Sequence, residues 1–512
     1  MLTKVYSAGI QGVQAFEIIV ETHIERSTPR YFLVGLAEGA VKESYSRILS
    51  AVKNSGFQMP GRKITQNLAP ADLRKEGSAF DLPLTIGILA GEDMVASSFL
   101  EETIILGELA LDGTLRPVKG ALPIAIEAPK MGKKQIILPK ENAAEAAIPG
   151  TATIWGVSTL LEAVQVLNGR PSIEPTVIDL DKIFGQSRVY HNDFSEVKGQ
   201  EHVKRALEVS AAGGHNIVMI GPPGSGKSML AKRFPTILPD MTLEEALETT
   251  KIHSIAGMVP SETGLIATRP FRSPHHTTSD SALVGGGRYP RPGEVSLAHH
   301  GVLFLDEFPE FKKPVLEVMR QPLEDGEVTI SRALTSLTYP AKFMLVAAMN
   351  PCPCGYATDP NHECTCGIGQ IHNYLNRISG PLMDRIDIHI EVPAVTYQEL
   401  SSKRDGEPSA EIRKRVQAAR KIQNRRFKEL PHVFSNAQMT SRELKKYAQI
   451  SQEGSQLMQI SINKLGLSAR AYDRILKVSR TIADLEESES IQLHHLSEAI
   501  QYRSLDRNLG IL

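Results

Sequence analysis

Long apolar runs are missing from this 512-residue chain, and so is an excess of charge of either sign. No stretch approaches about 18 consecutive apolar residues, the length that a membrane-spanning helix needs. The first residues, MLTKVYSAGIQGVQAF, lack the unbroken apolar segment of a signal peptide. We therefore expect a soluble, cytoplasmic protein without a membrane partner.

The charge balance excludes a global attraction to polyanions. Lys and Arg number 57, Asp and Glu number 58, and the formal net charge is −1. Any contact with DNA must therefore come from local patches. Hydrophobic residues make up 41% and charged residues 22%, the values of an ordinary globular chain, and the length predicts about two to four domains.

Cysteine is scarce, and all four cysteines lie in one window, PCPCGYATDPNHECTCG. Cys352, Cys354, Cys364 and Cys366 form two Cys-x-Cys pairs, which are separated by a turn rich in Gly, Asp and Pro. Four thiolates in this arrangement suit a tetrahedral structural zinc, with His362 as a substitute for one sulfur. Free thiols or a redox pair are the alternatives, since stable disulfides are rare in the cytosol.

The histidines include two adjacent pairs, His275–His276 and His299–His300. Such pairs suggest a metal site only when further ligands follow at metal-binding spacing. Nothing at that spacing accompanies them here. We therefore expect these histidines to have a polar packing role.

The segment GPPGSGKSML, residues 221 to 230, has the spacing of a phosphate-binding loop. It follows the apolar run HNIVMI and precedes the helix-compatible MLAKRF, so the motif stands in a strand–loop–helix context. Its glycines let successive N–H groups point inward toward phosphate oxygens, with Lys227 on the β- and γ-phosphates and Ser228 on Mg²⁺. A glycine-rich turn without a ligand is the alternative. The predicted ATP-contacting residues are Gly221, Pro222, Pro223, Gly224, Ser225, Gly226, Lys227 and Ser228.

A second strand must supply carboxylates, because Mg²⁺ has to be held and the attacking water oriented. GVLFLDE, residues 301 to 307, is a continuous apolar run followed by two acids, as in a strand buried on both faces. Asp306 is placed to hold the metal, and Glu307 is placed to polarise the water. A capped core strand without a catalytic role is the other interpretation.

A third apolar run, AKFMLVAAMN, ends in Asn350. A polar side chain at the end of a central strand beside the phosphates can sense whether the γ-phosphate is present. An asparagine that only caps the turn before Pro351 would give the same pattern.

Long strings around these motifs resemble one family. KGQEHVKRALEVSAAGGHNIVMIGPPGSGKS, RPFRSPHHTTSDSALVGGG, RPGEVSLAHHGVLFLDEFPEF, LEDGEVTISRA and SGPLMDRIDIHIEV are similar to the AAA+ module of the YifB/ComM proteins, relatives of the magnesium chelatase ATPase subunit. MLTKVYSAGIQG, NLAPADLRKEGSAFDLP and GELALDGTLRPVKGALP resemble the amino-terminal domain of the same proteins, which is similar to a Lon-protease domain. The likeness extends over nearly the whole chain.

The resemblance implies site residues that spacing alone does not give. In AAA+ rings ATP lies between subunits, and an arginine of the neighbour completes the site. Arg385, in LMDRIDI, matches this arginine finger, with Arg377 as a competitor, and Arg470, in LGLSARAYDR, matches the second sensor on the helical lid. A surface salt bridge is the alternative for each arginine. Since the cysteines lie between Asn350 and Arg385, we expect them to brace the segment that presents the finger.

These observations predict a multidomain α/β protein. Residues 1–170 alternate short β-rich runs with helical stretches, as in an α+β, Lon-protease-like domain, and residues 171–192 form a linker. Residues 193–395 form the P-loop AAA+ core with a parallel sheet, in which residues 197–200 resemble the segment that cups the adenine. Residues 405–512 hold amphipathic segments of a C-terminal helical lid.

The protease dyad of Lon-like domains is absent from the matched positions. Such a dyad consists of a serine and a lysine that activates the hydroxyl. KEGSAFDLP places Ala79 at the nucleophile position, with Ser78 one residue early, and LRPVKGALP places Leu122 at the base position. We therefore expect a non-proteolytic domain. A register slip that pairs Ser78 with Lys119 is the remaining alternative.

Two insertions bear on the substrate. EVTISRALTSLTYPAKF, residues 327 to 343, predicts a β-hairpin that resembles one projecting into the pore of the ring, and ALVGGGRYPRPGEVSLA resembles a second insertion of this clade. Arg332, Arg288 and Arg291 would give these loops positive charge suited to a phosphate backbone. A packing role is the alternative for the insertions. The basic segment 411–430 is typical of a helix that binds nucleic acid, and a solvated helix face is the alternative.

The resemblance implies a ring-forming ATPase, with six subunits expected, that couples ATP hydrolysis to translocation on single-stranded or branched DNA. Branch migration in recombination, of the kind that integrates incoming DNA in natural transformation, is the implied activity. A chelatase-type motor that remodels a protein partner is the first rival, and it typically lacks the Lon-like domain. An ATP-dependent protease is disfavoured by Ala79 and Leu122, and a non-enzymatic scaffold is disfavoured by Glu307.

Overall fold

The computed structural model describes residues 2–35, 39–73, 75, 77–186, 190–287, 290–332, 335–396, 399, 401, 406–430 and 433–505. The chain forms two compact units, Met1–Arg188 with Leu243–Ala267, and Val189–Thr242 with Thr268–Leu512. Both units mix strands and helices, and the second contains a parallel sheet, so the predicted multidomain α/β class is confirmed. Among these residues, no helix is both long enough and apolar enough to cross a bilayer.

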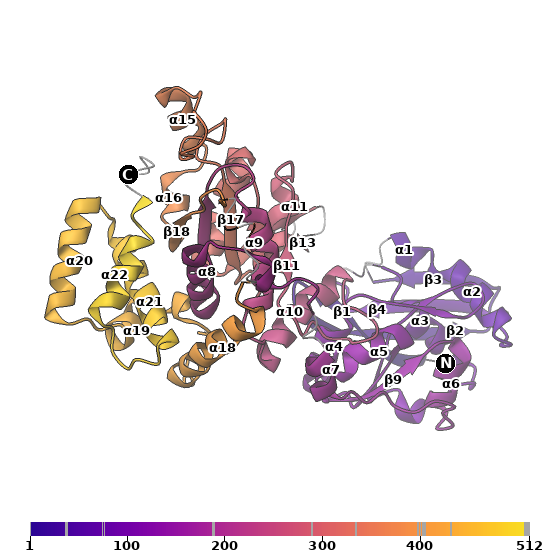
Figure 1. Ribbon diagram of the computed structural model, residues 1–512. Helices are drawn as coiled ribbons and strands as arrows, with labels where there is room; N and C mark the ends of the chain where they lie inside the picture. Colours follow the sequence, from indigo (N-terminus) through magenta and orange to yellow (C-terminus); the bar gives the residue numbers. More distant parts are fainter. Residues whose placement is uncertain are drawn as a thin grey trace. The chain divides into compact units, whose positions relative to one another are not determined.

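The first unit is built on a seven-stranded mixed sheet with the order β3-β4-β2-β1-β5-β8-β9 (Figure 1). The pairs β1/β2 and β2/β4 are antiparallel, and the other neighbours are parallel. The strands are β1 Leu2–Gln11, β2 Gln14–Glu25, β3 Arg30–Val34, β4 Lys63–Ala69, β5 Thr103–Ile105, β8 Gln135–Pro139 and β9 Thr153–Val157, with a small separate pair, β6 Glu108–Leu109 and β7 Leu115–Arg116. The helices are α1 Gly39–Lys42, α2 Ser44–Asn54, α3 Asp81–Gly91, α4 Ala121–Glu127, α5 Lys140–Ala147, α6 Leu160–Leu167 and α7 Leu180–Gln186.

Helix α3 is the centre of the first unit. Its sequence, DLPLTIGILAG, is predominantly apolar, every residue in it is buried, and it packs on β1, β2 and α2. A Cβ on Gly87 would lie 2.4 Å from the Thr22 hydroxyl, so only glycine allows the helix to approach the sheet this closely. The fold of this unit therefore depends on packing around α3.

The segment Leu243–Ala267, which the sequence places within the ATPase core, groups with the first unit. Its helix α10, Leu243–Ala256, packs on α4. The backbone N–H of Gly120 donates to the Ser254 carbonyl at 3.1 Å. A segment that interrupts the second unit in sequence therefore packs as part of the first unit.

The second unit is built on a five-stranded, all-parallel sheet with the order β11-β14-β17-β10-β18. The strands are β11 Phe271–Arg272, β14 Val302–Leu305, β17 Met344–Met349, β10 Ile217–Ile220 and β18 Ile388–Glu391. Strands β10 and β14 are buried at every position, as their apolar runs predict. The core helices are α8 Glu201–Gly213, α9 Lys227–Arg233, α11 Asp280–Val284, α12 Glu294–Leu297, α13 Lys313–Glu317, α14 Arg320–Asp325, α15 Ile368–Leu375 and α16 Gly380–Met383.

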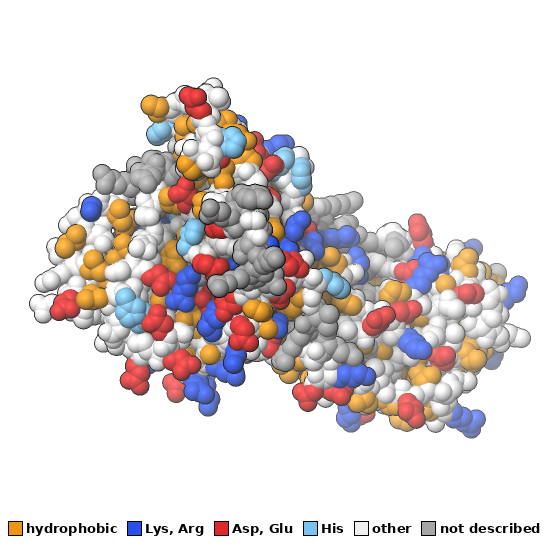
Figure 2. Space-filling view, in the orientation of Figure 1, with side chains coloured by type: hydrophobic (Ala, Val, Ile, Leu, Met, Phe, Trp, Pro, Cys, Tyr) orange, Lys and Arg blue, Asp and Glu red, His pale blue; other side chains and the backbone are white. Residues whose placement is uncertain are grey.

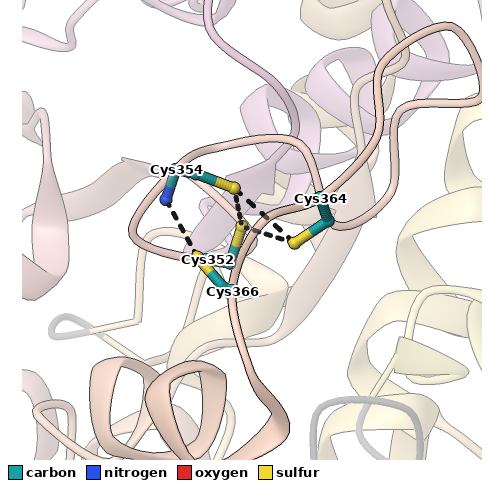
Figure 3. Close-up of side chains that lie close together, drawn as sticks. All are labelled: Cys352, Cys354, Cys364 and Cys366. Atoms are coloured by element: carbon teal, nitrogen blue, oxygen red, sulfur yellow. Dashed lines mark hydrogen bonds between the residues drawn. The ribbon is translucent and has the colours of Figure 1, made fainter.

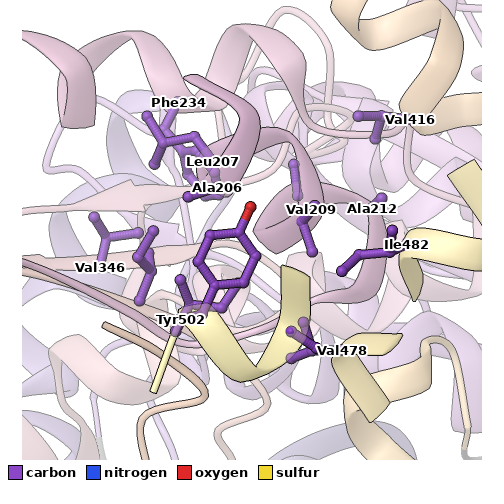
Figure 4. Packing of buried hydrophobic residues seen from close by; sticks show 14 of the residues in the cluster. Ala206, Leu207, Val209, Ala212, Phe234, Val346, Val416, Val478, Ile482 and Tyr502 are labelled. Carbon is purple, nitrogen blue, oxygen red and sulfur yellow. The ribbon is translucent and has the colours of Figure 1, made fainter. Parts of the chain in front are cut away.

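The carboxy-terminal helices share one hydrophobic core with the parallel sheet. Helices α18 and α21 both pack on α8, and Figure 4 shows Val416 and Ile482 from these helices beside Ala212 of α8. We call these helices the lid; they are α18 Ser409–Arg426, α19 Ser441–Tyr447, α20 Gln452–Leu465, α21 Ala469–Leu485 and α22 Leu493–Gln501.

The predicted hairpin is present as β15, Glu327–Arg332, and β16, Thr335–Pro340, paired antiparallel. The second insertion forms a short pair, β12 Gly285–Gly286 and β13 Arg291–Pro292. The Tyr339 hydroxyl of the hairpin donates to the Pro290 carbonyl at 2.8 Å, so the two insertions pack together. Arg288 and the side chain of Arg332 lie outside the described residues.

Candidate active site at the strand ends of the second unit

Three neighbouring parallel strands bring the predicted ATP-site residues together. In the sheet, β17 lies between β14 and β10, and Ile220 of β10 is opposite Met349 of β17. The loop after β10, the acids after β14 and Asn350 after β17 therefore meet at one edge, where the carboxyl ends of parallel strands form a ligand site. The sequence predicts each of these residues at the end of a strand. The order of the strands in the sheet then makes the three strand ends neighbours.

The loop 221–228 has the backbone that its glycines predict. Gly224 and Gly226 have φ of 76° and 87°, which L side chains rarely adopt. A Cβ on Gly221 would lie 2.1 Å from the Val392 carbonyl oxygen, so this position has no room for a side chain. Ser225 is buried, and Lys227 begins helix α9. The strand–loop–helix arrangement of a phosphate-binding loop is therefore in place.

The Lys227 ammonium lies inside this loop. It donates to the carbonyls of Gly221 at 2.7 Å and Pro222 at 2.8 Å, and it lies 3.3 Å from Asn350 Oδ1. Burial lowers the pKa of Lys227 to about 8, while the charge of Asp306 acts in the opposite direction. The lysine is thus held where a bound phosphate would meet it, close to the residue predicted to sense the γ-phosphate.

A hydroxyl and a carboxylate form the predicted magnesium position. Ser228 Oγ donates to Asp306 Oδ2 at 2.6 Å, across 78 residues of sequence. Oxygen ligands of this kind suit Mg²⁺, which is usually held by one or two protein side chains, by water and by substrate phosphates. The residues present therefore fit the ion that phosphoryl transfer requires.

Glu307 is positioned by its backbone and by a histidine. It adopts φ 50°, and its N–H donates to Asp306 Oδ1 at 2.9 Å. Its carboxylate lies 2.9 Å from Nδ1 of His276, whose ring also contacts the ring of His275. The sequence predicts only polar packing for His276, because no local pattern links two residues so far apart in the chain.

Gln200 connects the predicted adenine segment with the phosphate loop. Its amide nitrogen donates to the carbonyls of Ser225 at 2.8 Å and Pro393 at 3.1 Å. Its buried Oε1 is among the side-chain atoms without a hydrogen-bond partner in the part of the chain that the structure describes. An unpaired buried acceptor is costly, so this oxygen is a candidate to receive a ligand N–H.

The predicted arginine finger, Arg385, and the predicted second sensor, Arg470, meet at one carboxylate. Arg385 is 5% exposed, pairs with Glu324 and donates to the Pro381 carbonyl at 2.7 Å. Arg470, whose side chain is 56% exposed, lies 3.5 Å from the other oxygen of Glu324. Hydrogen bonding from Arg385 lowers the pKa of Glu324. Nothing in the sequence of α14 singled out this acid.

The competing arginine, Arg377, and two arginines near Arg470 in sequence have different partners. Arg377 pairs with Glu310 at 2.7 Å and packs over the ring of Tyr374. Arg474 pairs with the buried Asp387, and Arg480 pairs with Asp484 at 3.0 Å. Arg385 and Arg470 are thus brought together, whereas the other three arginines have separate partners. The role of Arg385 toward a neighbour's ATP and the role of Arg470 as a sensor in cis or trans stay predictions.

The four cysteine sulfurs converge, as Figure 3 shows. The Cys352 sulfur lies 3.3 Å from that of Cys354 and 3.7 Å from that of Cys364, and the sulfurs of Cys354 and Cys364 are 3.6 Å apart. A tetrahedron with Zn–S bonds of about 2.3 Å has sulfur–sulfur edges of about 3.8 Å. His362 instead pairs with Asp359 at 3.0 Å. The residues present therefore fit a four-sulfur zinc site.

Backbone donors surround these sulfurs. The N–H of Cys354 donates to the Cys366 sulfur at 3.4 Å. The N–H of Tyr356, and to a smaller extent that of Thr365, lowers the pKa of Cys354, which falls to about 5. Against backbone hydrogen bonds, burial and the neighbouring thiols raise the pKa of Cys364 to about 11 and also raise that of Cys366, so one charge is favoured in the cluster when no metal is bound. Hydrogen bonds to a thiolate favour the charged form, which is the form that binds metals.

The basic segment 411–430 uses part of its charge internally. Arg415 pairs with Glu208 and Glu407 at 2.5 Å each, and Arg426 pairs with the buried Asp484 at 2.5 Å. Lys421 and Arg425 are exposed. Figure 2 likewise shows acidic and basic side chains interspersed over each unit on the face drawn. This helix therefore uses some of its basic residues in ion pairs and exposes others, so both interpretations stay predictions.

The matched protease positions of the first unit carry no Ser–Lys contact among the described residues. The Ser78 hydroxyl donates to Glu108, and the Lys119 side chain packs against Gly257. Leu122 is fully buried, and its N–H donates to Glu145 at 3.0 Å. Burial raises the pKa of Glu145, and the hydrogen bond from the Leu122 N–H acts in the opposite direction. These contacts support a structural interpretation of the dyad positions.

Comparison with known proteins gives one consistent family. The model described as "Magnesium chelatase, subunit ChlI" matches residues 193–400, "Subunit ChlI of Mg-chelatase" matches 20–142, and "Magnesium chelatase, subunit ChlI C-terminal" matches 406–503. The chain is 46% identical to the competence protein ComM of Haemophilus influenzae and 45% identical to YifB of Escherichia coli, each over 99% of this chain and 98% of the relative. It is 27% identical to the magnesium-chelatase 38 kDa subunit of Rhodobacter capsulatus, over 31% of this chain and 50% of that protein.

Identity at this level over nearly the whole of both chains goes beyond a shared ATPase core, since it includes the first unit and the cysteine segment. Together with the phosphate-binding loop and the two acids at the strand ends, it places this chain in the YifB/ComM family of magnesium-chelatase-like AAA+ ATPases.

Proposed function

We propose that this protein is an ATP-hydrolysing ring motor that acts on DNA. The observation that carries the ATPase part is the meeting of Lys227, Asp306, Glu307 and Asn350 at the carboxyl ends of three neighbouring strands. A site that only binds nucleotide needs no carboxylate at position 307. The DNA part draws on the similarity to ComM, which is named a competence protein.

Each residue has a defined task in the proposed hydrolysis. Lys227 would exchange its carbonyl partners for phosphate oxygens. Ser228 and Asp306 would hold Mg²⁺, which would supply positive charge to offset that of the phosphates. Glu307 accepts a proton from the attacking water or orients it. Asn350, 3.3 Å from Lys227, contacts the γ-phosphate and so distinguishes ATP from ADP.

A neighbouring subunit is proposed to complete the site. Arg385 and Arg470 lie on one acidic residue, Glu324, and Arg385 lines a cavity of about 460 Å³ that Glu324 also lines. On assembly the planar guanidinium would leave Glu324 for the neighbour's triphosphate, where it stabilises charge on the transferred phosphoryl group. We propose a homo-oligomeric ring, with six subunits expected.

Mixed rings test this arrangement. Arg385→Ala and Lys227→Ala subunits should each be inactive alone, because one lacks the finger and the other lacks the phosphate grip. A mixture should recover part of the ATPase activity, since some interfaces combine an intact loop with an intact finger. Absence of rescue in mixtures that still co-assemble would refute a trans-acting Arg385.

The proposed substrate is single-stranded or branched DNA in the cytoplasm, and the proposed activity is branch migration in recombination during natural transformation. Arg291 is exposed on the second insertion beside the hairpin, so positive charge is available close to these loops. The proposed cofactors are Mg²⁺ and a zinc ion in the cysteine tetrad.

The direct test is ATP-dependent movement of a three-way or four-way DNA junction by the purified protein. Wild type should convert the junction to duplex products with ATP and Mg²⁺, whereas Glu307→Gln should bind the junction without converting it. Casein with the same protein serves as a protease control and should stay intact. Junctions left unchanged under conditions in which wild type hydrolyses ATP would refute the DNA motor and leave the ATPase standing.

A chelatase-like motor that remodels a protein partner is the second candidate. The magnesium-chelatase models match residues 20–142, 193–400 and 406–503, and these matches favour this candidate. The two candidates differ in what stimulates turnover. DNA should raise the ATPase rate of a DNA motor, and a protein remodeller should be indifferent to it.

A further inference from the structure

We propose that a zinc ion bound by the four cysteines holds residues 352–377, here called the cysteine insert, as a clip on the ATP site. This rests on the proposed ATPase function and assigns the metal a task within it. The insert contacts each of the three strand-end elements that form the site. Loss of the metal would therefore weaken ATP binding, although no cysteine lies in the phosphate-binding loop.

The first contact is with the phosphate-binding loop. Gly355 has φ 91°, and a Cβ built on it would lie 2.6 Å from Pro223 Cδ. The backbone of the insert thus packs directly on the proline that follows Gly221 and Pro222. Gly355 also donates its N–H to the carbonyl of the buried Cys352 at 3.0 Å, so the turn that contacts Pro223 is part of the cysteine cluster itself.

The second contact is with Asn350. Only Pro351 separates Asn350 from Cys352, and the backbone N–H of Asn350 lies close enough to the hydroxyl of Tyr374, from the insert helix α15, to oppose the rise that burial causes in the pKa of Tyr374. Tyr374 is 5% exposed. Asn350 is therefore next to the insert both in sequence and in space, while its side chain contacts Lys227.

The third contact is with the turn that carries Glu307. Arg377, at the end of the insert, pairs with Glu310 at 2.7 Å. The N–H of Glu310 donates to the Glu307 carbonyl at 2.7 Å. The insert thus reaches the carbonyl of the water-polarising residue through one ion pair and one backbone hydrogen bond.

The loop itself has little other support. Residues 352–367 form neither helix nor strand, and their hydrogen bonds are turns such as Asp359 N–H to the Tyr356 carbonyl at 3.1 Å. Four sulfurs within 4.8 Å of one another, with backbone N–H donors aimed at them, are the feature that closes this loop. Neutral thiols attract one another weakly, whereas a zinc ion bound to four thiolates supplies folding free energy directly.

The sequence predicts that the cysteines brace the segment presenting Arg385, but the contacts point to a different target. Arg385 bonds to Pro381 and Glu324, and among the described residues neither belongs to the insert. Pro223, Asn350 and Glu310 are the residues that the insert holds. Zinc is therefore assigned to the chain's own nucleotide site rather than to the finger.

The test measures metal content and nucleotide affinity separately on the full-length protein. We expect one zinc per chain by elemental mass spectrometry. Removing it with a chelator, followed by return to Mg²⁺ buffer, should weaken binding of a fluorescent ATP analogue about tenfold or more, and zinc should restore the affinity. Cys364→Ser should behave like the metal-free protein, with folding of the remainder checked by circular dichroism.

Two variants in the same loop distinguish the effect of the insert's contact with the phosphate-binding loop from the effect of zinc binding. Gly355→Ala should keep its zinc and still lose affinity for the ATP analogue, because the added methyl group strains the backbone and meets Pro223. His362→Ala is the matched control and should keep both zinc and affinity, since His362 contacts Asp359 and Tyr356 rather than the sulfurs.

Three results would overturn the proposal: a chain isolated without zinc under reducing conditions, a chain that holds iron or disulfides instead, and a zinc-depleted chain with unchanged affinity for the ATP analogue. Failure of the ATPase proposal would give a different result: wild type would hold zinc and bind no nucleotide. If both proposals are right, Lys227→Ala should lose nucleotide binding and keep its zinc.

Discussion

The two units of this chain both place a motif beside a buried sheet, but only one of the motifs keeps its reactive side chains. In the second unit, Lys227, Asp306 and Asn350 lie within hydrogen-bonding distance of one another or of Ser228. In the first unit, the dyad positions hold Ala79 and the fully buried Leu122. If the resemblance to a Lon-like domain holds, the first unit is an α/β scaffold that keeps its packing although its chemistry is absent.

The contacts around the dyad positions of the first unit are structural. The N–H of Leu122 donates to the buried Glu145, and Ser78 donates to Glu108. The Ser78 hydroxyl and these two carboxylates take part in hydrogen bonds within the unit, as polar groups in folded proteins generally do. In the second unit, by contrast, the Lys227 amine is bound to backbone carbonyls that a phosphate can replace.

The largest expected effect is that of Glu307→Gln. Since a general base contributes about 100-fold or more to a rate, ATP turnover should fall by at least that factor, while ATP binding is kept. The measurement is steady-state phosphate release beside binding of a fluorescent ATP analogue. Equal turnover by the variant and wild type would remove Glu307 from its proposed role.

Lys227→Ala should weaken ATP binding about 100-fold, because a charged hydrogen-bonding group worth about 3 kcal/mol is lost from the phosphates. Titration of the fluorescent analogue measures this, with thermal unfolding as a check on folding. A variant that binds ATP as tightly as wild type would mean that the loop 221–228 does not grip phosphate.

The pH dependence of ATP affinity should be smaller, about tenfold. Burial lowers the pKa of Lys227 to about 8 in the free protein, and bound phosphate must raise it, so binding takes up a proton above pH 8. Affinity should therefore be constant below pH 7 to 8 and fall about tenfold between pH 7 and 9. Phosphate groups, whose last pKa is about 6, stay ionised over this range and add no slope. A flat profile would contradict the assigned pKa.

Ser78→Ala should have the smallest effect. If the first unit is non-proteolytic, removing this hydroxyl should change neither ATPase rate nor junction processing, and casein should be intact with both proteins. Arg47→Ala is the contrasting structural variant, since Arg47 bonds the buried Asp81 at 2.7 and 2.9 Å and its loss leaves that carboxylate unpaired. ATP-dependent casein cleavage that Ser78→Ala abolishes would restore the protease interpretation.

The parts of the site that follow directly from a strand were predictable from sequence. The loop after β10 and the acids after β14 carry their own signals, because an apolar run fixes where the strand ends and the next residues must leave the sheet. Asn350 is similar. Family resemblance then selected Arg385 and Arg470 among many arginines.

Contacts between elements distant in sequence were not predictable. Glu324 as the common partner of Arg385 and Arg470, and His276 beside Glu307, depend on where separate helices and loops come to rest. The same holds for Leu243–Ala267, which packs on α4 although the surrounding sequence belongs to the ATPase core.

By itself, the sequence determined the residue types and the local backbone: glycines that permit a phosphate loop, acids after a buried strand and four thiols within one turn. Only the tertiary structure decided their partners, including the contact of Gly355 with Pro223 and the placement of β17 between β14 and β10. The physical reason is that backbone conformation and burial depend largely on residues that are neighbours in sequence. A contact between elements, by contrast, depends on the shapes and charges of both surfaces and on the order in which strands join the sheet.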